Sequence, residues 1–229
     1  MIPSEQVWIV MPVFNESRVL NDVVTEINRA GWNNIIIVDD GSHDNTHDIA
    51  STLPGVVALR HKINRGKGAA VKTGMQAAKL KGARIVVTLD GDGQHNPQDI
   101  APMVKLIEQD YEVVLGSRLH NPQGMPRHKV LANHIGNLIT WALFGIRVTD
   151  SQSGFRAFSQ KALELVDTIG DDYEYDSEII QQIKLHRLSY TEVPIEVRYT
   201  KYSLGKTGKK QDIVYGLKTL YRMIWHIIS

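Results

Sequence analysis

The chain has 229 residues, enough for one large domain with a substantial hydrophobic core. Its 26 lysines and arginines nearly balance 25 aspartates and glutamates, so it has no overall basic field to attract nucleic acid, and no nucleic-acid partner is expected. It contains no cysteine, which excludes disulfides, thiolate catalysis and cysteine-based zinc sites, and fits a reducing compartment.

Targeting signals are missing from the sequence. The first residues do not show the charged-then-apolar pattern of a secretory signal peptide. No run of about 18 apolar residues predicts a membrane-spanning helix. We therefore expect a cytoplasmic protein.

Strand-like and helix-like segments alternate through the first half of the chain. Apolar, largely β-branched runs predict buried strands at residues 7–14, 34–39, 56–59, 85–89 and 112–118. The segments between them repeat apolar residues every three or four positions, the spacing of a helix with one buried face. This alternation predicts right-handed crossovers and an α/β fold, with a Rossmann-like, doubly wound and mostly parallel sheet flanked by helices.

Polar clusters follow four of these strands. They are Asn15-Glu16, Asp39-Asp40, Asp90-Gly91-Asp92 and Ser117-Arg118. In doubly wound sheets, ligands bind beyond the carboxyl ends of the strands, so the clusters predict one shared site. A purely structural explanation does not require four strands to end in this way.

Asp90-Gly91-Asp92 places two carboxylates one residue apart directly after a buried strand. Hard oxygen ligands on a bend, where glycine lets the backbone approach a ligand, suit Mg²⁺ or Mn²⁺ held together with substrate phosphates. Because Asp and Gly are also common turn residues, the segment alone is equally consistent with a simple turn. The neighbouring strand ends favour the metal site.

The alternation loosens after Arg118. Residues 120–128 predict a loop with two prolines, and a strongly apolar helix follows over residues 130–143. Residues 190–199 alternate around Pro194 and predict an edge strand. The tail from Asp212 predicts an amphipathic helix, which either lies in a membrane interface or packs on the domain or on a second subunit of a homodimer.

Three common motifs are missing. The first strand is followed by Pro12-Val-Phe-Asn-Glu16 and not by the Gly-x-Gly-x-x-Gly of dinucleotide-binding folds. Gly205-Lys206-Thr207 does not complete a Walker phosphate loop, because Thr200 stands where that pattern needs glycine. No Gly-x-Ser-x-Gly elbow of a hydrolase occurs. What remains is a nucleotide site without a glycine fingerprint that uses a metal on Asp90 and Asp92.

Seven motifs follow one another along the chain. They are Pro12-Val-Phe-Asn-Glu16, Val38-Asp-Asp-Gly-Ser42, Asn64-Arg-Gly-Lys-Gly68, Asp90-Gly-Asp92-Gly-Gln94-His95, Gly116-Ser-Arg118, Asp150 to Arg156 and Glu192-Val-Pro-Ile195. In this order they resemble family 2 glycosyltransferases of the GT-A fold, over roughly residues 6 to 200. The chain is most similar to the dolichol-phosphate mannosyltransferase-like enzymes, which transfer a sugar from a nucleotide sugar to a polyprenyl phosphate.

The resemblance implies a role for each motif. The donor nucleotide, from a GDP- or UDP-hexose, would lie against Pro12, Val13, Glu16, Asp39, Lys67, Asp90 and Gly91. Mg²⁺ or Mn²⁺ would be held on the diphosphate by Asp90, Asp92 and Gln94. The acceptor phosphate would be gripped by Arg118, Arg127 and Lys206, because cationic side chains match phosphate oxygens. The expected catalytic residues are Asp90, Asp92, Arg118 and Arg127.

The resemblance also implies an organisation and a reaction. Residues 1–210 would form the glycosyltransferase domain, and residues 211–229 the amphipathic helix. The acceptor would be a polyprenyl (dolichyl or undecaprenyl) phosphate at the cytoplasmic membrane face. Because that phosphate is already anionic at neutral pH, single displacement with inversion needs no strong base.

Three alternatives stay open at this point. A hydroxyl acceptor would need a carboxylate base, and Asp150 or Glu178 would be the first to test. A sugar nucleotidyltransferase also uses a metal on a doubly wound sheet, but releases pyrophosphate. A non-catalytic module that binds nucleotide sugars would show no turnover.

Overall fold

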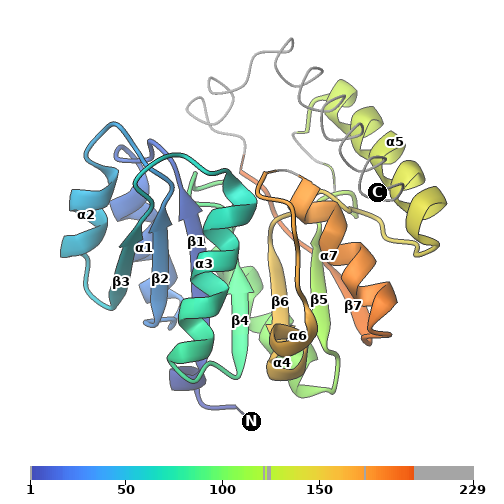
Figure 1. Cartoon of the computed structure of the whole chain (residues 1–229), viewed down its shortest axis with the longest axis horizontal. Coiled ribbons are helices and arrows are strands. Elements are labelled where there is room, and N and C mark those ends of the chain that lie inside the picture. The colour runs from blue at the N-terminus through green and yellow to red at the C-terminus, as the bar shows by residue number, and fades with distance from the viewer. Residues whose placement is uncertain (1, 121, 123–124, 173, 199–229) are drawn as a thin grey trace.

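A computed structural model describes residues 2–120, 122, 125–172 and 174–198 (Figure 1). One seven-stranded sheet has the order β3-β2-β1-β4-β6-β5-β7. The strands are β1 (Val7–Val13), β2 (Ile35–Asp39), β3 (Val56–Arg60), β4 (Ile85–Thr88), β5 (Val113–Ser117), β6 (Arg156–Ser159) and β7 (Tyr190–Pro194). Among the seven strands that the structure describes, only the pairings made by β6 are antiparallel. The predicted α/β fold with a mostly parallel sheet is confirmed.

Helices cover both faces of the sheet. One face packs against α1 (Leu20–Arg29), α2 (Thr46–Thr52) and α4 (Ile100–Glu108), and the other against α3 (Lys67–Leu80), α6 (Gln160–Leu165) and α7 (Glu174–Leu185). Short 3₁₀ helices occupy Ser4–Gln6 and Pro97–Asp99, and α5 (Arg127–Phe144) lies beyond β5 and β7 (Figure 1). Because β2 and β4 are buried at every position, their unbroken apolar sequences are explained.

The antiparallel strand β6 determines where the site lies. It enters between β4 and β5 and pairs Thr88 with Arg156, so β4 and β5 are not neighbours. The sequence predicted only a short strand-like run to Phe158, without its direction. Because β6 runs against its neighbours, the turn at residues 150–155 that leads into it lies at the carboxyl ends of β4 and β5.

Two predictions fall partly or wholly outside the described residues. The edge strand predicted over residues 190–199 is confirmed as β7, which ends earlier, at Pro194. Among the described strands β7 pairs with β5 alone. The amphipathic helix predicted for residues 211–229 lies outside the described residues, and so does Lys206. Within the described part of the chain, no helix combines the length and the apolar character that crossing a bilayer requires.

Candidate active site

The turn after β4 carries the two predicted metal ligands. A Cβ on Gly91 would lie 2.4 Å from Cγ1 of Val13, so only glycine lets this turn pack directly on β1. Oδ1 of Asp92 accepts the N–H of Gln94 at 3.0 Å, which closes the turn. Asp90, Asp92 and Gln94 therefore lie together at the carboxyl edge of the sheet, as predicted.

Lys67, the first residue of α3, contacts this turn. Its Nζ lies 2.8 Å from Oδ1 of Asp90. The preceding bend is fixed by Asp40, whose carboxylate accepts the N–H groups of Arg65 at 3.0 Å and Gly66 at 2.8 Å. The second acid of the Asp39-Asp40 pair thus positions Lys67, and both of its carboxylate oxygens are engaged in doing so.

A second acid lies on the other side of Lys67. Oδ2 of Asp176, on α7, is 3.6 Å from Nζ of Lys67, and Oδ1 of Asp176 is 3.5 Å from Nη2 of the buried Arg156. Arg156 also donates to the carbonyls of Ser151 and Ser153, both at 2.8 Å. Alternating charges of Asp90, Lys67, Asp176 and Arg156 therefore run from the turn to β6.

Sequence reasoning assigned no role to Asp176, because the helix dipole alone explains acids at the start of α7. A usable signal was nevertheless present. Asp176 is spaced three, four and seven residues from Ile179, Ile180 and Ile183, so it shares their buried face. An acid on the apolar stripe of a helix needs a buried partner.

The predicted donor cradle lies on β1 and β2. Pro12 and Val13 end β1, and Asp39 ends β2 with its carboxylate fully buried. Asp39 accepts the N–H of Ser42 at 3.0 Å and pairs with Nε of Arg60 at 3.2 Å. The N–H of Glu16 donates to Oγ1 of Thr46 at 2.9 Å, which ties the loop after β1 to α2. The structure thus brings the predicted cradle residues to adjacent loops.

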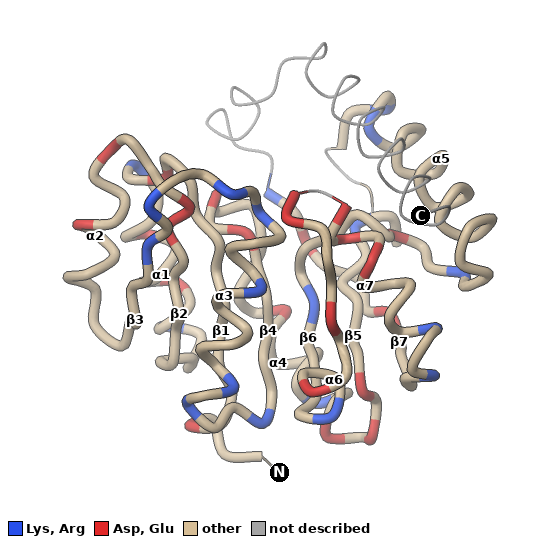
Figure 2. Tube along the Cα trace, viewed as in Figure 1, with Lys and Arg blue, Asp and Glu red and all other residues tan. Residues whose placement is uncertain are grey.

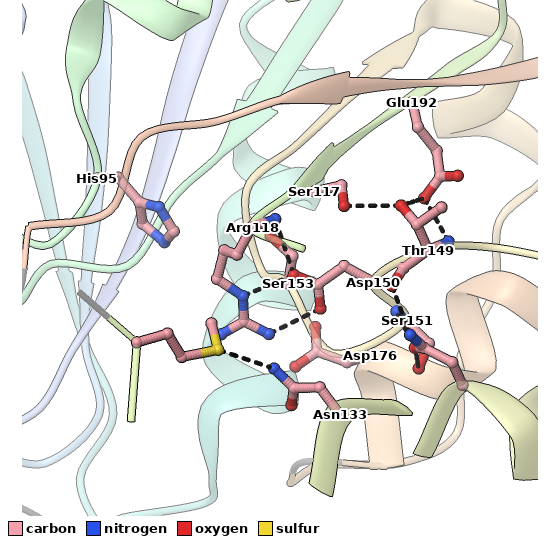
Figure 3. Close-up of polar contacts among 12 residues, drawn as sticks. His95, Ser117, Arg118, Asn133, Thr149, Asp150, Ser151, Ser153, Asp176 and Glu192 are labelled. Carbon is pink, nitrogen blue, oxygen red and sulfur yellow. Dashed lines mark hydrogen bonds and ion pairs between the residues drawn. The ribbon is translucent and has the colours of Figure 1, made fainter. Parts of the chain in front are cut away.

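The predicted acceptor residue Arg118 is held by Asp150 (Figure 3). Nε and Nη2 of Arg118 lie 2.7 Å and 2.8 Å from the two carboxylate oxygens of Asp150, and the Arg118 N–H donates to Asp150 at 3.0 Å. Asp150 is buried, so this bidentate pair fixes the direction of the guanidinium. Arg127, the other predicted acceptor residue, begins α5 and is exposed.

The two candidate bases, Asp150 and Glu178, are both engaged in contacts within the protein. Asp150 is engaged by Arg118. The carboxylate of Glu178 accepts the N–H groups of Ile169 at 2.8 Å and Gly170 at 2.9 Å, and so holds the loop before α7. The Glu178 carboxylate therefore acts here as an anchor for this loop.

A protein-family model decides the identity. Residues 8–166, from β1 to the end of α6, match the model described as glycosyl transferase family 2. The chain belongs to glycosyl transferase family 2.

This glycosyltransferase is similar to two relatives in sequence and to one solved structure in fold. An uncharacterised protein of Methanocaldococcus jannaschii is 38% identical, over 97% of this chain and 93% of its own. The UDP-N-acetylglucosamine–dolichyl-phosphate N-acetylglucosaminyltransferase of Methanococcus voltae is also 38% identical, over 95% and 94%. The fold is similar to that of Mycobacterium tuberculosis glucosyl-3-phosphoglycerate synthase, crystallised with Mn²⁺, UDP and glucosyl-3-phosphoglycerate, with a TM-score of 0.68, 17% identity and coverage of 97% and 79%. The predicted GT-A fold is confirmed.

In this glycosyltransferase, the charges around the turn after β4 shift the pKa values of Asp90 and Asp92 in opposite directions. Burial alone would raise the pKa of Asp90, but Lys67 and His95 outweigh it and hold that pKa well below the ordinary range. Burial also disfavours the charged form of Lys67, yet Asp176 and Asp90 raise its pKa above the ordinary range. Burial and the charge of Asp90 raise the pKa of Asp92. Lys67 therefore pairs with Asp90, whereas Lys67 and His95 offset the charge of Asp92 only in part.

This donor set fits a divalent cation. Two carboxylate side chains on one bend are hard ligands, and the raised pKa of Asp92 marks negative charge that a cation would relieve. In the described part of the chain, no group of three His, Cys, Asp or Glu side chains forms a complete metal site. The two carboxylates on this bend suit a divalent cation of the kind that proteins bind by one or two carboxylates together with substrate phosphates.

Proposed function

We propose that the chain transfers a sugar from a nucleoside-diphosphate sugar to a polyprenyl phosphate. One observation carries this proposal: β6 brings the Asp90-Asp92 turn and the Arg118-Asp150 pair to the same edge of the sheet. The edge thus presents acids for a metal-bound diphosphate and a fixed guanidinium for a second phosphate. The name of the Methanococcus voltae relative, a dolichyl-phosphate N-acetylglucosaminyltransferase, supports the same pair of substrates.

On the donor side, Pro12, Val13, Glu16, Asp39 and Gly91 form the nucleotide cradle. Lys67 reaches the diphosphate from the start of α3, where Asp40 holds the bend. Asp90, Asp92 and Gln94 hold Mg²⁺ or Mn²⁺. When bound, the metal neutralises charge on the departing nucleoside diphosphate. The Mn²⁺ and UDP in the glucosyl-3-phosphoglycerate synthase crystals support this assignment.

On the acceptor side, Arg118, Arg127 and Lys206 bind the phosphate. This phosphate is already charged at neutral pH, so the rate depends on the orientation of the substrates and on electrostatic stabilisation. The displacement inverts the anomeric centre. The engagement of Asp150 and Glu178 disfavours a hydroxyl acceptor, which needs a free carboxylate base. We assign the reaction to residues 1–210, and contacts with a membrane or a second subunit to residues 211–229.

Radiolabelled UDP- and GDP-hexoses offered with polyprenyl phosphate and Mn²⁺ test the function. We expect a labelled lipid from one donor, and a loss of about 100-fold or more in rate for Asp92→Asn. Asp22→Asn, on the exposed side of α1, is the matched control and should retain activity. Absence of labelled lipid with every donor, while nucleotide still binds, would overturn the proposal. Release of pyrophosphate would instead show a nucleotidyltransferase.

A further inference from the structure

Helix α5 turns its polar side inward and its apolar side outward. Asn133 and Thr140 are only 7% and 1% exposed, whereas Leu131, Ile135 and Leu138 are 62%, 51% and 59% exposed. A surface helix of a globular protein normally shows the reverse arrangement. Contiguous apolar side chains that face outward mark an interaction surface.

The inward side of α5 is fixed to the active site by hydrogen bonds. Oδ1 of Asn137 accepts from both the N–H and the hydroxyl of Ser151, each at 2.9 Å, and Nδ2 of Asn137 donates to the carbonyl of Thr149. Thr149 and Ser151 flank Asp150, the partner of Arg118. The orientation of α5 is therefore set by polar contacts with the acceptor side of the site.

The sequence segment that contains α5 carries charged side chains of one sign. The chain has 25 acidic residues among 229, yet none falls between residues 118 and 149, where Arg118, Arg127, Lys129 and Arg147 occur. Figure 2 shows α5 with basic positions and no acidic ones. A second copy of this face would repel it, and residues 199–229, with six lysines and arginines against one aspartate, offer no complementary charge. The charge that complements this face is that of an anionic surface.

An aromatic side chain completes the outward side. Trp141 is 41% exposed, and the guanidinium of Arg147 lies 5.0 Å from the centre of its ring. Tryptophan beside a cation is typical of the boundary between lipid headgroups and hydrocarbon.

We propose that the α5 face, formed by Leu131, Ile135, Leu138 and Trp141, docks on a membrane surface that contains anionic lipids. This inference rests on the proposed function, because a polyprenyl phosphate acceptor lies in a membrane. Helix α5 lies beyond the carboxyl ends of β5 and β7 (Figure 1), on the same side as Arg118. Docking would therefore bring the acceptor phosphate to the guanidinium while the donor edge stays in water.

Co-sedimentation of the full-length protein with vesicles tests the α5 face. One vesicle contains phosphatidylglycerol and phosphatidylcholine, and the other phosphatidylcholine alone. We expect wild type to bind the anionic vesicle, and the triple variant Leu131→Ser/Ile135→Ser/Leu138→Ser to bind it about tenfold or more weakly. The control Leu80→Ser/Leu185→Ser, at exposed apolar positions on α3 and α7, should bind like wild type.

Each alternative cover of this face gives a different result. Equal vesicle binding by wild type and the triple variant, or no binding by wild type, overturns the proposal. A large fall in Tm of the triple variant would show that its own chain covers the face, and loss of a dimer in light scattering would show that a second copy does. If the triple variant shows a fall in Tm or the loss of a dimer while its vesicle binding is unchanged, membrane docking through the α5 face is also overturned.

Failure of the inference can be told from failure of the proposed function. Transfer to a short-chain, water-soluble prenyl phosphate, without vesicles, should be the same for wild type and the triple variant. If wild type transfers to neither acceptor but binds vesicles through α5, only the proposed function fails. If both proteins transfer to the soluble acceptor and neither responds to vesicles, only the inference fails.

Discussion

Nζ of Lys67 lies 2.8 Å from Oδ1 of Asp90 and joins the start of α3 to the turn after β4. Gly154 leaves the space for this pair, since a Cβ there would lie 2.5 Å from Nζ and 3.0 Å from Oδ1. The ion pair therefore depends on three segments that are distant in the sequence, and it links the proposed diphosphate side of the site to the turn that leads into β6.

Replacing Lys67 by methionine should destabilise the protein by roughly 1–3 kcal/mol, less than for a fully buried pair because the two side chains are 22% and 34% exposed. The folded pKa of Asp90 is depressed, so its stabilisation is present above the unfolded pKa of about 4 and is lost as the pH falls through the lower folded value. The difference in unfolding free energy between wild type and Lys67→Met, measured with urea, should therefore be smaller at pH 3 than at pH 7, because pH 3 lies about one unit below the unfolded pKa.

Lys79→Met, at an exposed position in the last turn of α3, is the control and should change the unfolding free energy by less than about 0.5 kcal/mol. An equal loss at both pH values for Lys67→Met would contradict the ion-pair explanation.

Replacing Asp150 by asparagine should weaken acceptor binding and leave donor binding unchanged. The amide keeps the shape of the side chain but loses the charge that holds Arg118 in two contacts. We expect the acceptor KM to rise about tenfold, consistent with a lost charge-assisted hydrogen bond. Kinetics at saturating donor and calorimetric titration with nucleotide separate the two effects. An equal weakening of nucleotide binding would show a general disturbance of the site.

Replacing Glu178 by glutamine should lower stability without changing the pH dependence of kcat/KM. The carboxylate anchors the N–H groups of Ile169 and Gly170, and its loss removes charged hydrogen bonds worth about 1–3 kcal/mol. Thermal unfolding measures the first effect and a pH–rate profile the second. A profile that loses its acidic limb in the variant would identify Glu178 as a base after all.

Asp44 gives a second pH-dependent prediction. Burial opposes its charge, but hydrogen bonds from Thr46 and Ser17 together outweigh burial and lower the pKa of Asp44 from 3.8 to about 2. A depressed pKa contributes stability above the unfolded value, which is lost as the pH falls from about 4 to 2. Asp44→Asn should cost roughly 1 kcal/mol at pH 7, after allowance for solvent screening, and almost nothing near pH 2. Denaturant unfolding at both pH values checks this.

The half of the molecule that we propose to bind the donor followed from the sequence. Unbroken β-branched runs predicted the central strands, and their polar ends predicted Asp39, Asp90 and Asp92 at one edge. Those signals are local, because a strand buried on both faces needs apolar residues throughout and a ligand site needs polar ones where it ends.

The half that we propose to bind the acceptor depended on contacts between distant residues. Period and composition do not give the direction of β6, which is set by its pairing with β4 and β5 about 40 to 70 residues away. For the same reason the Arg118–Asp150 pair and the engagement of Asp176 by Lys67 became visible only in the fold. The inverted exposure of α5 was equally hidden, because its apolar periodicity is that of an ordinary core helix.

The insertion of β6 between β4 and β5 also implies an order of assembly. During synthesis, β1 to β4 can pair as soon as residue 88 is available, whereas β5 finds no partner until residues 156–159 have emerged. In that interval one edge of β4 is unpaired and open to aggregation. We expect the segment from β1 to β4 to be the first part of the nascent chain to resist proteolysis, and Arg118 to acquire its partner Asp150 later.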